Sequence, residues 1–200
     1  MTRMKHFILA LGLTLAAAPV LADDITDAVQ EGLAAYKENN LGKAASQWEY
    51  AAQLVRQNKA KKVTELLPKP LEGWKANEAD SSSAGAAMFG GGINVSREYY
   101  VEDEDGNQGD SSVTVELTMD SPLLQSMIGM LANPQFAAMS GGKITKINGI
   151  QAIQEGGGDD NTKLSLVINN TVLVTVEGQP EKDVMAYAKA IDFKAIANLK

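Results

Sequence analysis

The sequence predicts an α+β fold, in which an N-terminal helical hairpin precedes an antiparallel sheet of about seven strands with two packed helices. Two observations support this class. Apolar residues recur at helical spacing from Ile25 to about Leu67, whereas from Val113 to Met119 they alternate with polar residues, as in a half-buried strand. The helical and strand patterns also stand in separate blocks, which favours α+β over a fold of alternating strands and helices.

Residues 1–22 have the features of a secretory signal peptide. Arg3 and Lys5 give a positive start, Phe7 to Ala18 is an apolar run too short to span a bilayer comfortably, and a small residue, Ala22, precedes Asp23. We therefore expect cleavage after Ala22 and export to a bacterial periplasm. No later run reaches the roughly 18 apolar residues of a membrane helix, so we expect no membrane span in the exported chain.

Cleavage changes the chemistry that the chain can perform. The only histidine, His6, leaves with the signal peptide, and the sequence has no cysteine. The remaining residues cannot form a Ser-His-Asp or Cys-His catalytic group, nor the usual zinc sites. We therefore expect a protein that is not an enzyme and has no cofactor. Loss of Arg3 and Lys5 moves the formal charge from −7 to −9, which argues against nucleic acid as a partner.

The helical hairpin is predicted over residues 23–67. Its first helix has a stripe of apolar residues at helical spacing, made of Ile25, Val29, Leu33 and Tyr36. Asn39 to Gly42 interrupts the pattern where a turn is expected, and the second helix has an apolar stripe that includes Trp48 and ends before Pro68. The two prolines of residues 68–72 predict an extended linker, after which residues 73–200 form the sheet domain.

Small and aromatic residues recur through this hairpin: Gly32, Ala35, Tyr36, Lys37, Asn39, Leu41, Ala44, Trp48 and Ala51. Over residues 25–67 the pattern resembles a single tetratricopeptide unit, in which small residues let two helices approach and aromatic ones fill the space between them. The resemblance implies a protein-binding hairpin with Tyr36, Leu41 and Trp48 at the interface, and another periplasmic protein as the partner. The alternative is a hairpin that only docks on the following domain.

The first half of the sheet domain is predicted to contain a short strand opening at Gly73-Trp74, a mobile loop over Ser81–Gly92, two strands around Ile93–Val101 and Val113–Met119, and a helix from Ser121-Pro122 to Asn133-Pro134. The second half is predicted to contain a hairpin over 143–155 that turns at Asn148-Gly149, a second hairpin over 163–177 that turns at Asn169-Asn170, and a closing helix over 180–200. A break of this closing helix near Asp192 is an open alternative. The run 163–177 is apolar on both faces, which predicts that it lies inside the sheet.

Three features of this domain together resemble the PsbP-like class of small exported domains: Gly73-Trp74 near its start, the run Asn148 to Ala152, and the C-terminal helix. The resemblance implies an accessory or assembly role, and it carries over no catalytic residue. For catalysis, the best remaining pair is Arg97 with Glu116 on facing strands, which we interpret as a cross-strand ion pair.

An acidic tip between the first two long strands is a candidate cation site. Asp103, Asp105 and Asn107 have the spacing of oxygen ligands in a calcium loop. Gln108 replaces the expected glycine and Thr114 the expected glutamate, and strands flank the loop instead of helices. The alternative is a solvated hairpin tip.

A second candidate site is an apolar pocket between the methionine-rich helix and the sheet. Met127 and Met130 lie one turn apart, and Met88 and Phe89 could cover them from the glycine-rich loop. Such a pocket would carry a small apolar ligand, or a soft metal ion bound by thioethers. The alternative is that Met127 fills the core beside Leu124.

Overall fold

The computed structural model describes residues 20–81, 91–131, 135, 139, 141–158 and 160–199. Most of the predicted signal peptide, together with Met88 and Phe89, therefore lies outside the described residues. The chain divides into two compact units, residues 1–54 and 55–200, and each is considered by itself. The structure confirms the α+β class.

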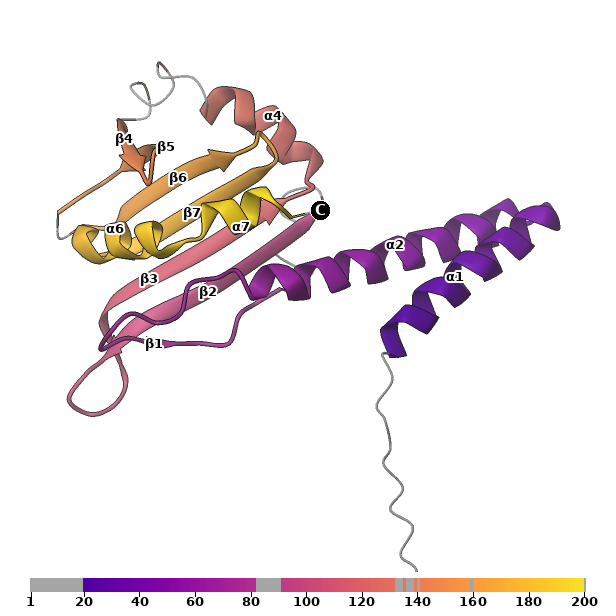
Figure 1. The fold of residues 1–200 in the computed structure, drawn as a ribbon, viewed down its shortest axis with the longest axis horizontal. Helices are drawn as coiled ribbons and strands as arrows, with labels where there is room; N and C mark the ends of the chain where they lie inside the picture. The colour runs from indigo at the N-terminus through magenta and orange to yellow at the C-terminus, as the bar shows by residue number, and fades with distance from the viewer. Residues whose placement is uncertain are drawn as a thin grey trace, which may run out of the picture. The chain divides into compact units, whose positions relative to one another are not determined.

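The first unit is a helical hairpin made by α1 (Val20–Lys37) and the first part of α2 (Leu41–Thr64), which run antiparallel (Figure 1). The turn between them depends on two asparagines. Asn39 takes a φ of 59°, and the Asn40 Oδ1 accepts a hydrogen bond of 3.1 Å from the Lys43 amide. Asn40 therefore caps α2, as asparagine commonly does at a helix start, and the predicted turn is confirmed.

The second unit contains a seven-stranded sheet in which all neighbouring strands are antiparallel and the order is β1-β2-β3-β7-β6-β5-β4. Its strands are β1 (Lys75–Ala76), β2 (Ile93–Glu102), β3 (Gln108–Met119), β4 (Lys143–Ile147), β5 (Ile150–Glu155), β6 (Thr162–Ile168) and β7 (Val172–Gln179). The predicted number of strands is confirmed. The pairing of β7 with β3 joins the two halves of the sheet, although a long segment separates these strands in sequence.

The hairpin of β6 and β7 lies in the middle of this sheet, as predicted. Asn169 and Asn170 have φ values of 50° and 56°, and the Thr171 amide donates to the Ile168 carbonyl at 3.0 Å, which closes the turn. Alternate residues of both strands are buried on one face: Leu164, Leu166, Ile168, Val172, Val174 and Val176. Val167 and Leu173 lie on the other face, in or against a second apolar cluster.

Helices cover both faces of the central strands. In Figure 1, α6 (Glu181–Ala190) and α7 (Phe193–Ala197) cross one face, where Val184 and Tyr187 enter the main core. On the other face, α4 (Pro122–Leu131) packs Leu124 and Ile128 against Leu173. The last turns of α2, which belong to the second unit, add Ala60 and Val63 to the main core.

The closing helix is broken at Asp192, which confirms the open alternative. Asp192 Oδ1 accepts hydrogen bonds from the amides of Lys194 and Ala195, at 3.1 and 2.9 Å. These bonds satisfy donors that the first turn of α7 leaves free, so a new helix starts there.

Two tyrosines hold the proline segment that follows α2. Tyr99 donates its hydroxyl to the Pro68 carbonyl at 2.6 Å, and the Leu71 amide donates to the Tyr187 hydroxyl at 3.2 Å. The two rings lie 4.3 Å apart between centroids. Burial raises the pKa of Tyr99 to about 12 and also raises the pKa of Tyr187, because the ionised phenolate would lose its hydration.

Two sequence expectations about side-chain direction are wrong. Met127 is 38% exposed, because the stripe of α4 that faces the sheet passes through Leu124 and Ile128 instead. Arg97 pairs in register with Val115, and Glu116 pairs with Ser96. Since successive residues of a strand point to opposite faces, Arg97 and Glu116 cannot form a cross-strand ion pair.

Candidate functional site

Small residues form the buried interface of the helical hairpin. The buried residues are Ala28, Gly32 and Ala35 of α1 and Ala44 and Ala51 of α2, with Leu54 as the one large side chain among the described buried residues of the hairpin. Residues of this size let two helices approach closely, but they remove little apolar surface from water. The interface therefore holds the helices together with few large contacts.

Gly32 is required by the position of Trp48. A Cβ atom at residue 32 would overlap Nε1 and Cδ1 of the Trp48 indole, which lies over the glycine. The Trp48 ring also meets the Tyr36 ring, with 5.9 Å between centroids and 40° between planes. These contacts fix the two aromatic side chains on one side of the hairpin.

Four large apolar side chains of the hairpin are exposed on that side. Val29 and Leu33 are each 46% exposed, Tyr36 56% and Trp48 41%. Val29, Leu33 and Tyr36 recur at i, i+4 and i+7, so they form one stripe of α1, which the Tyr36–Trp48 contact joins to α2. We call these four residues the apolar face. A contiguous exposed apolar patch on a soluble unit is typical of an interaction surface.

Sequence reasoning found part of this surface. Tyr36 and Trp48 were predicted, and both lie on the apolar face, where they contact each other. Leu41, also predicted, is 59% exposed as the first residue of α2. Val29 and Leu33 were missed, because the sequence pattern assigned them to the helix face that packs. The small-residue stripe of Ala28, Gly32 and Ala35 was the signal that could have corrected this.

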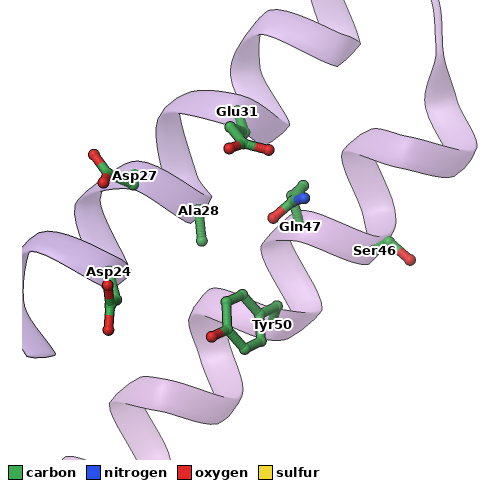
Figure 2. Close-up of a pocket in the computed structure, with 7 residues that line it drawn as sticks. All are labelled: Asp24, Asp27, Ala28, Glu31, Ser46, Gln47 and Tyr50. Carbon is green, nitrogen blue, oxygen red and sulfur yellow. The ribbon is translucent and has the colours of Figure 1, made fainter.

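The opposite side of the hairpin is an acidic groove of about 430 Å³. Figure 2 shows its lining: Asp24, Asp27, Ala28 and Glu31 from α1, and Ser46, Gln47 and Tyr50 from α2. No basic residue lines the groove, and none of its three carboxylates has an ion pair with any residue that the structure describes. The two sides of the hairpin therefore differ sharply in chemistry.

The predicted calcium ligands lie at the turn between β2 and β3. Asp103 Oδ1 accepts hydrogen bonds from the amides of Asp105 and Asn107, at 3.0 and 2.8 Å. This carboxylate therefore organises its own turn. The described ranges contain no group of three or more acidic, histidine or cysteine side chains placed to hold a metal ion. Calcium binding at Asp103, Asp105 and Asn107 stays a prediction.

A hollow of about 230 Å³ lies beside the end of α4, near the place where sequence reasoning predicted an apolar pocket. Its apolar lining comes from Leu131, Ile150, Ile153 and Val167, and its polar lining from Gln151, Ser165 and Asn170. Met127 and Met130 do not line it, and Met130 is 51% exposed. The predicted ligand-binding methionines therefore point elsewhere.

The titratable groups with shifted pKa values have structural partners. The Gly158 amide and the Gln154 side chain both donate to the Glu181 carboxylate at 2.8 Å, which lowers its pKa. Glu181 therefore ties the loop after β5 to the start of α6. Tyr99 and Tyr187 brace the proline segment in the same way.

Comparison with protein-family models, curated proteins and solved structures gives no match for this chain. The resemblances to a tetratricopeptide unit and to PsbP-like domains thus stay predictions, and function has to be inferred from this chain's own geometry. Among the helices that the structure describes, none is both long and apolar enough to cross a membrane.

Proposed function

We propose that the chain is an exported, non-enzymatic protein that acts through protein contacts, and that its docking surface is the apolar face of the helical hairpin. One observation carries the proposal. Apart from Leu54, the buried residues that the structure describes in the hairpin are alanine and glycine, whereas Val29, Leu33, Tyr36 and Trp48 are exposed. This is the reverse of the usual distribution, in which large apolar side chains are buried first.

The composition of the apolar face supports a protein partner. Tyr36 and Trp48 are aromatic residues of the kind enriched at the centres of protein interfaces, and their mutual contact orders both rings before binding. Val29 and Leu33 extend the same surface along α1 by two turns. A partner helix could therefore lie along this face without rearranging the hairpin.

The export part of the proposal rests on residues 1–22. The exported chain lacks the histidine and cysteine side chains that most nucleophilic and metal-dependent enzymes use, which leaves lysine and carboxylate residues as its possible catalytic groups. Cell fractionation with N-terminal sequencing tests this part. We expect a periplasmic chain that begins at Asp23, and a cytoplasmic chain with an intact N-terminus would contradict it.

Site-specific photo-cross-linking tests the docking surface. A photoreactive phenylalanine analogue replaces Leu33 on the apolar face or Leu123 on α4, which are matched at 46% and 47% exposure. We expect a discrete cross-linked protein from position 33 and none from position 123 in exporting cells. Equal cross-linking from both positions, or none from either, would remove the support for the hairpin as the docking surface.

A carrier of a small apolar ligand is the second candidate function, and the hollow beside α4 favours it. Leu131, Ile150, Ile153 and Val167 give it an apolar lining, although its volume of about 230 Å³ is below the usual range for ligand pockets. Native mass spectrometry of protein purified from its host distinguishes the two candidates. A stoichiometric bound lipid, lost in Val167→Asp, would establish the carrier function, and a bare chain would reject it.

A further inference from the structure

We propose that the occupant of the apolar face is a second copy of this chain, with the two α1 helices packed antiparallel about a two-fold axis. The inference rests on the proposed function, since it names the partner of the same surface. It follows from a symmetry in α1 itself. Both the apolar residues and the charges of this helix are arranged so that the helix complements its own reversed copy.

The apolar spacing of α1 is nearly symmetric about the point between Gln30 and Glu31. Ile25 and Tyr36 lie equally far from the midpoint between Gln30 and Glu31, and Val29 and Leu33 flank that midpoint closely. In an antiparallel pair of helices centred at that point, Ile25 of one copy lies at the same height along the helix axis as Tyr36 of the other. Val29 of one copy lies level with Gly32 of the other, one residue from Leu33. One patch can therefore serve both partners, as a two-fold interface requires.

The charges of α1 select the antiparallel direction. Asp23 is the acidic residue of the first turn, and Lys37 is the basic residue of the last turn. Asp23 and Lys37 are separated by two heptads, so they lie on the same flank of the helix. An antiparallel copy brings Asp23 of each helix toward Lys37 of the other, whereas a parallel copy would oppose like charges.

The acidic groove does not oppose this pairing. Asp24, Asp27 and Glu31 line the opposite side of the hairpin, across the buried stripe of Ala28 and Gly32. Their like charges therefore point away from the second copy. At an ionic strength near 0.15 M, repulsion between groups more than about 8 Å apart is largely screened.

The expected dimer is weak. Four side chains that are each about half exposed bury less than the roughly 1,200 Å² of a stable standard interface. We therefore expect dissociation in the micromolar range and rapid exchange of copies. Tyr36 and Trp48 are expected to contribute most, because large aromatic residues dominate small interfaces.

Sedimentation equilibrium of the exported chain, residues 23–200, tests the proposal. We expect the mass to rise from one chain toward two between low and high micromolar concentrations. Leu33→Ser should raise the dissociation constant about tenfold or more, because each dimer loses two buried leucines. Leu123→Ser removes an equally exposed leucine from α4 and should leave it unchanged.

A matched pair of charge changes tests the direction of packing. Lys37→Glu places an acid opposite Asp23 of the second copy, and should raise the dissociation constant roughly threefold. Lys43→Glu makes the same charge change on α2, whose contact with Asn40 uses only its backbone amide. Lys43→Glu should raise the dissociation constant by less than Lys37→Glu does. Equal effects from both would overturn the antiparallel arrangement.

Because the chain has no cysteine, single cysteines report the geometry directly. Gln30→Cys lies near the proposed axis, so a short bismaleimide should link two copies. In Lys37→Cys the two thiols would lie about 13 residues apart along the pair, or about 20 Å, and should not link. Equal linking at both positions indicates parallel copies and overturns the proposal.

The outcomes separate this inference from the proposed function. A chain that stays monomeric up to several hundred micromolar overturns the second copy. If position 33 then still cross-links to a different protein in cells, the hairpin remains a docking surface with another occupant. If position 33 cross-links to nothing, both proposals fall.

Discussion

The two units of this chain use large apolar residues in opposite ways. In the sheet unit, Leu117 and Leu166 are fully buried, whereas in the helical hairpin Val29 and Leu33 are each 46% exposed. The first arrangement completes its core within one chain. The second leaves Val29, Leu33, Tyr36 and Trp48 exposed, so the hairpin gains further stability when another surface covers them.

The magnitude of this difference follows from burial. A fully buried leucine contributes about 1.5–3 kcal/mol relative to an exposed one, whereas an alanine contributes far less. A pair of helices held by alanine and glycine is therefore marginal, since helices gain most of their stability from packing. The hairpin is therefore the part of the molecule whose stability depends most on its surroundings.

The largest expected difference is between leucine truncations in the two units. Leu117→Ala should lower the free energy of unfolding by about 3 kcal/mol, because it leaves a cavity in the sheet core. Leu33→Ala should change it by less than about 0.5 kcal/mol in dilute protein, because its side chain is half exposed. Urea unfolding followed by far-ultraviolet circular dichroism measures both. Comparable losses would show that the hairpin has a core of ordinary strength.

Tyr99→Phe tests the contribution of one buried hydrogen bond to the stability of the sheet unit. It leaves the buried Pro68 carbonyl without its hydrogen bond and should cost about 1–3 kcal/mol. The pKa of Tyr99 is raised from 10.0 to about 12, so folding favours the neutral phenol. The stability that this provides is complete below pH 10 and is lost as the pH rises toward 12.

Urea unfolding at a series of alkaline pH values checks this expectation. Tyr99→Phe should flatten the loss of stability above pH 10, with the remaining slope due to Tyr187, whose pKa is also raised. An unchanged slope in the variant would mean that Tyr99 does not govern alkaline unfolding.

Glycine substitutions probe the hairpin. Gly42→Ala adds a Cβ that meets nothing within 4 Å and should stabilise α2 by up to about 1 kcal/mol through helix propensity. Gly32→Ala should lose that gain, because the new Cβ displaces the Trp48 indole. The indole resonance of Trp48 in a ¹H–¹⁵N spectrum should shift in Gly32→Ala alone. If both variants leave it in place, Trp48 does not lie over Gly32.

Glu181→Gln should give the smallest effect. The change removes a charge that accepts hydrogen bonds from Gly158 and Gln154, so the melting temperature at neutral pH should fall slightly. Because folding lowers the pKa of Glu181 below 4.5, its contribution is complete above that pH and is lost as the pH falls through the lowered value. The difference between wild type and variant should therefore vanish in acid, and a constant difference would contradict this role.

Local patterns predicted most elements of the fold, because their causes are local. Asn169 and Asn170 adopt positive φ values at the central turn, and Asp192 breaks the closing helix by capping its second part. The strand order was not predictable, since the pairing of β7 with β3 depends on packing between segments that are distant in sequence. For the same reason the register that separates Arg97 from Glu116 could not be read from alternation alone.

The candidate site was predicted only in part. The aromatic pair Tyr36 and Trp48 was found, but which stripe of α1 packs against α2 depends on size as well as hydrophobicity. The alanine and glycine stripe allows the closer approach, so it is buried and leaves Val29 and Leu33 outside. Met127 was misplaced in the same way, because a helix that is apolar on most sides does not reveal which side faces the sheet.

Native-state hydrogen exchange tests most directly the claim that the hairpin is incomplete by itself. In dilute protein, the amides of α1 from Val29 to Tyr36 should exchange through local opening, far faster than those of β3 and β7, which should require global unfolding. Raising the protein concentration, or adding a captured partner, should slow exchange in α1 and leave the strands unchanged. Protection of α1 equal to that of β3 and β7 in dilute protein would contradict the claim.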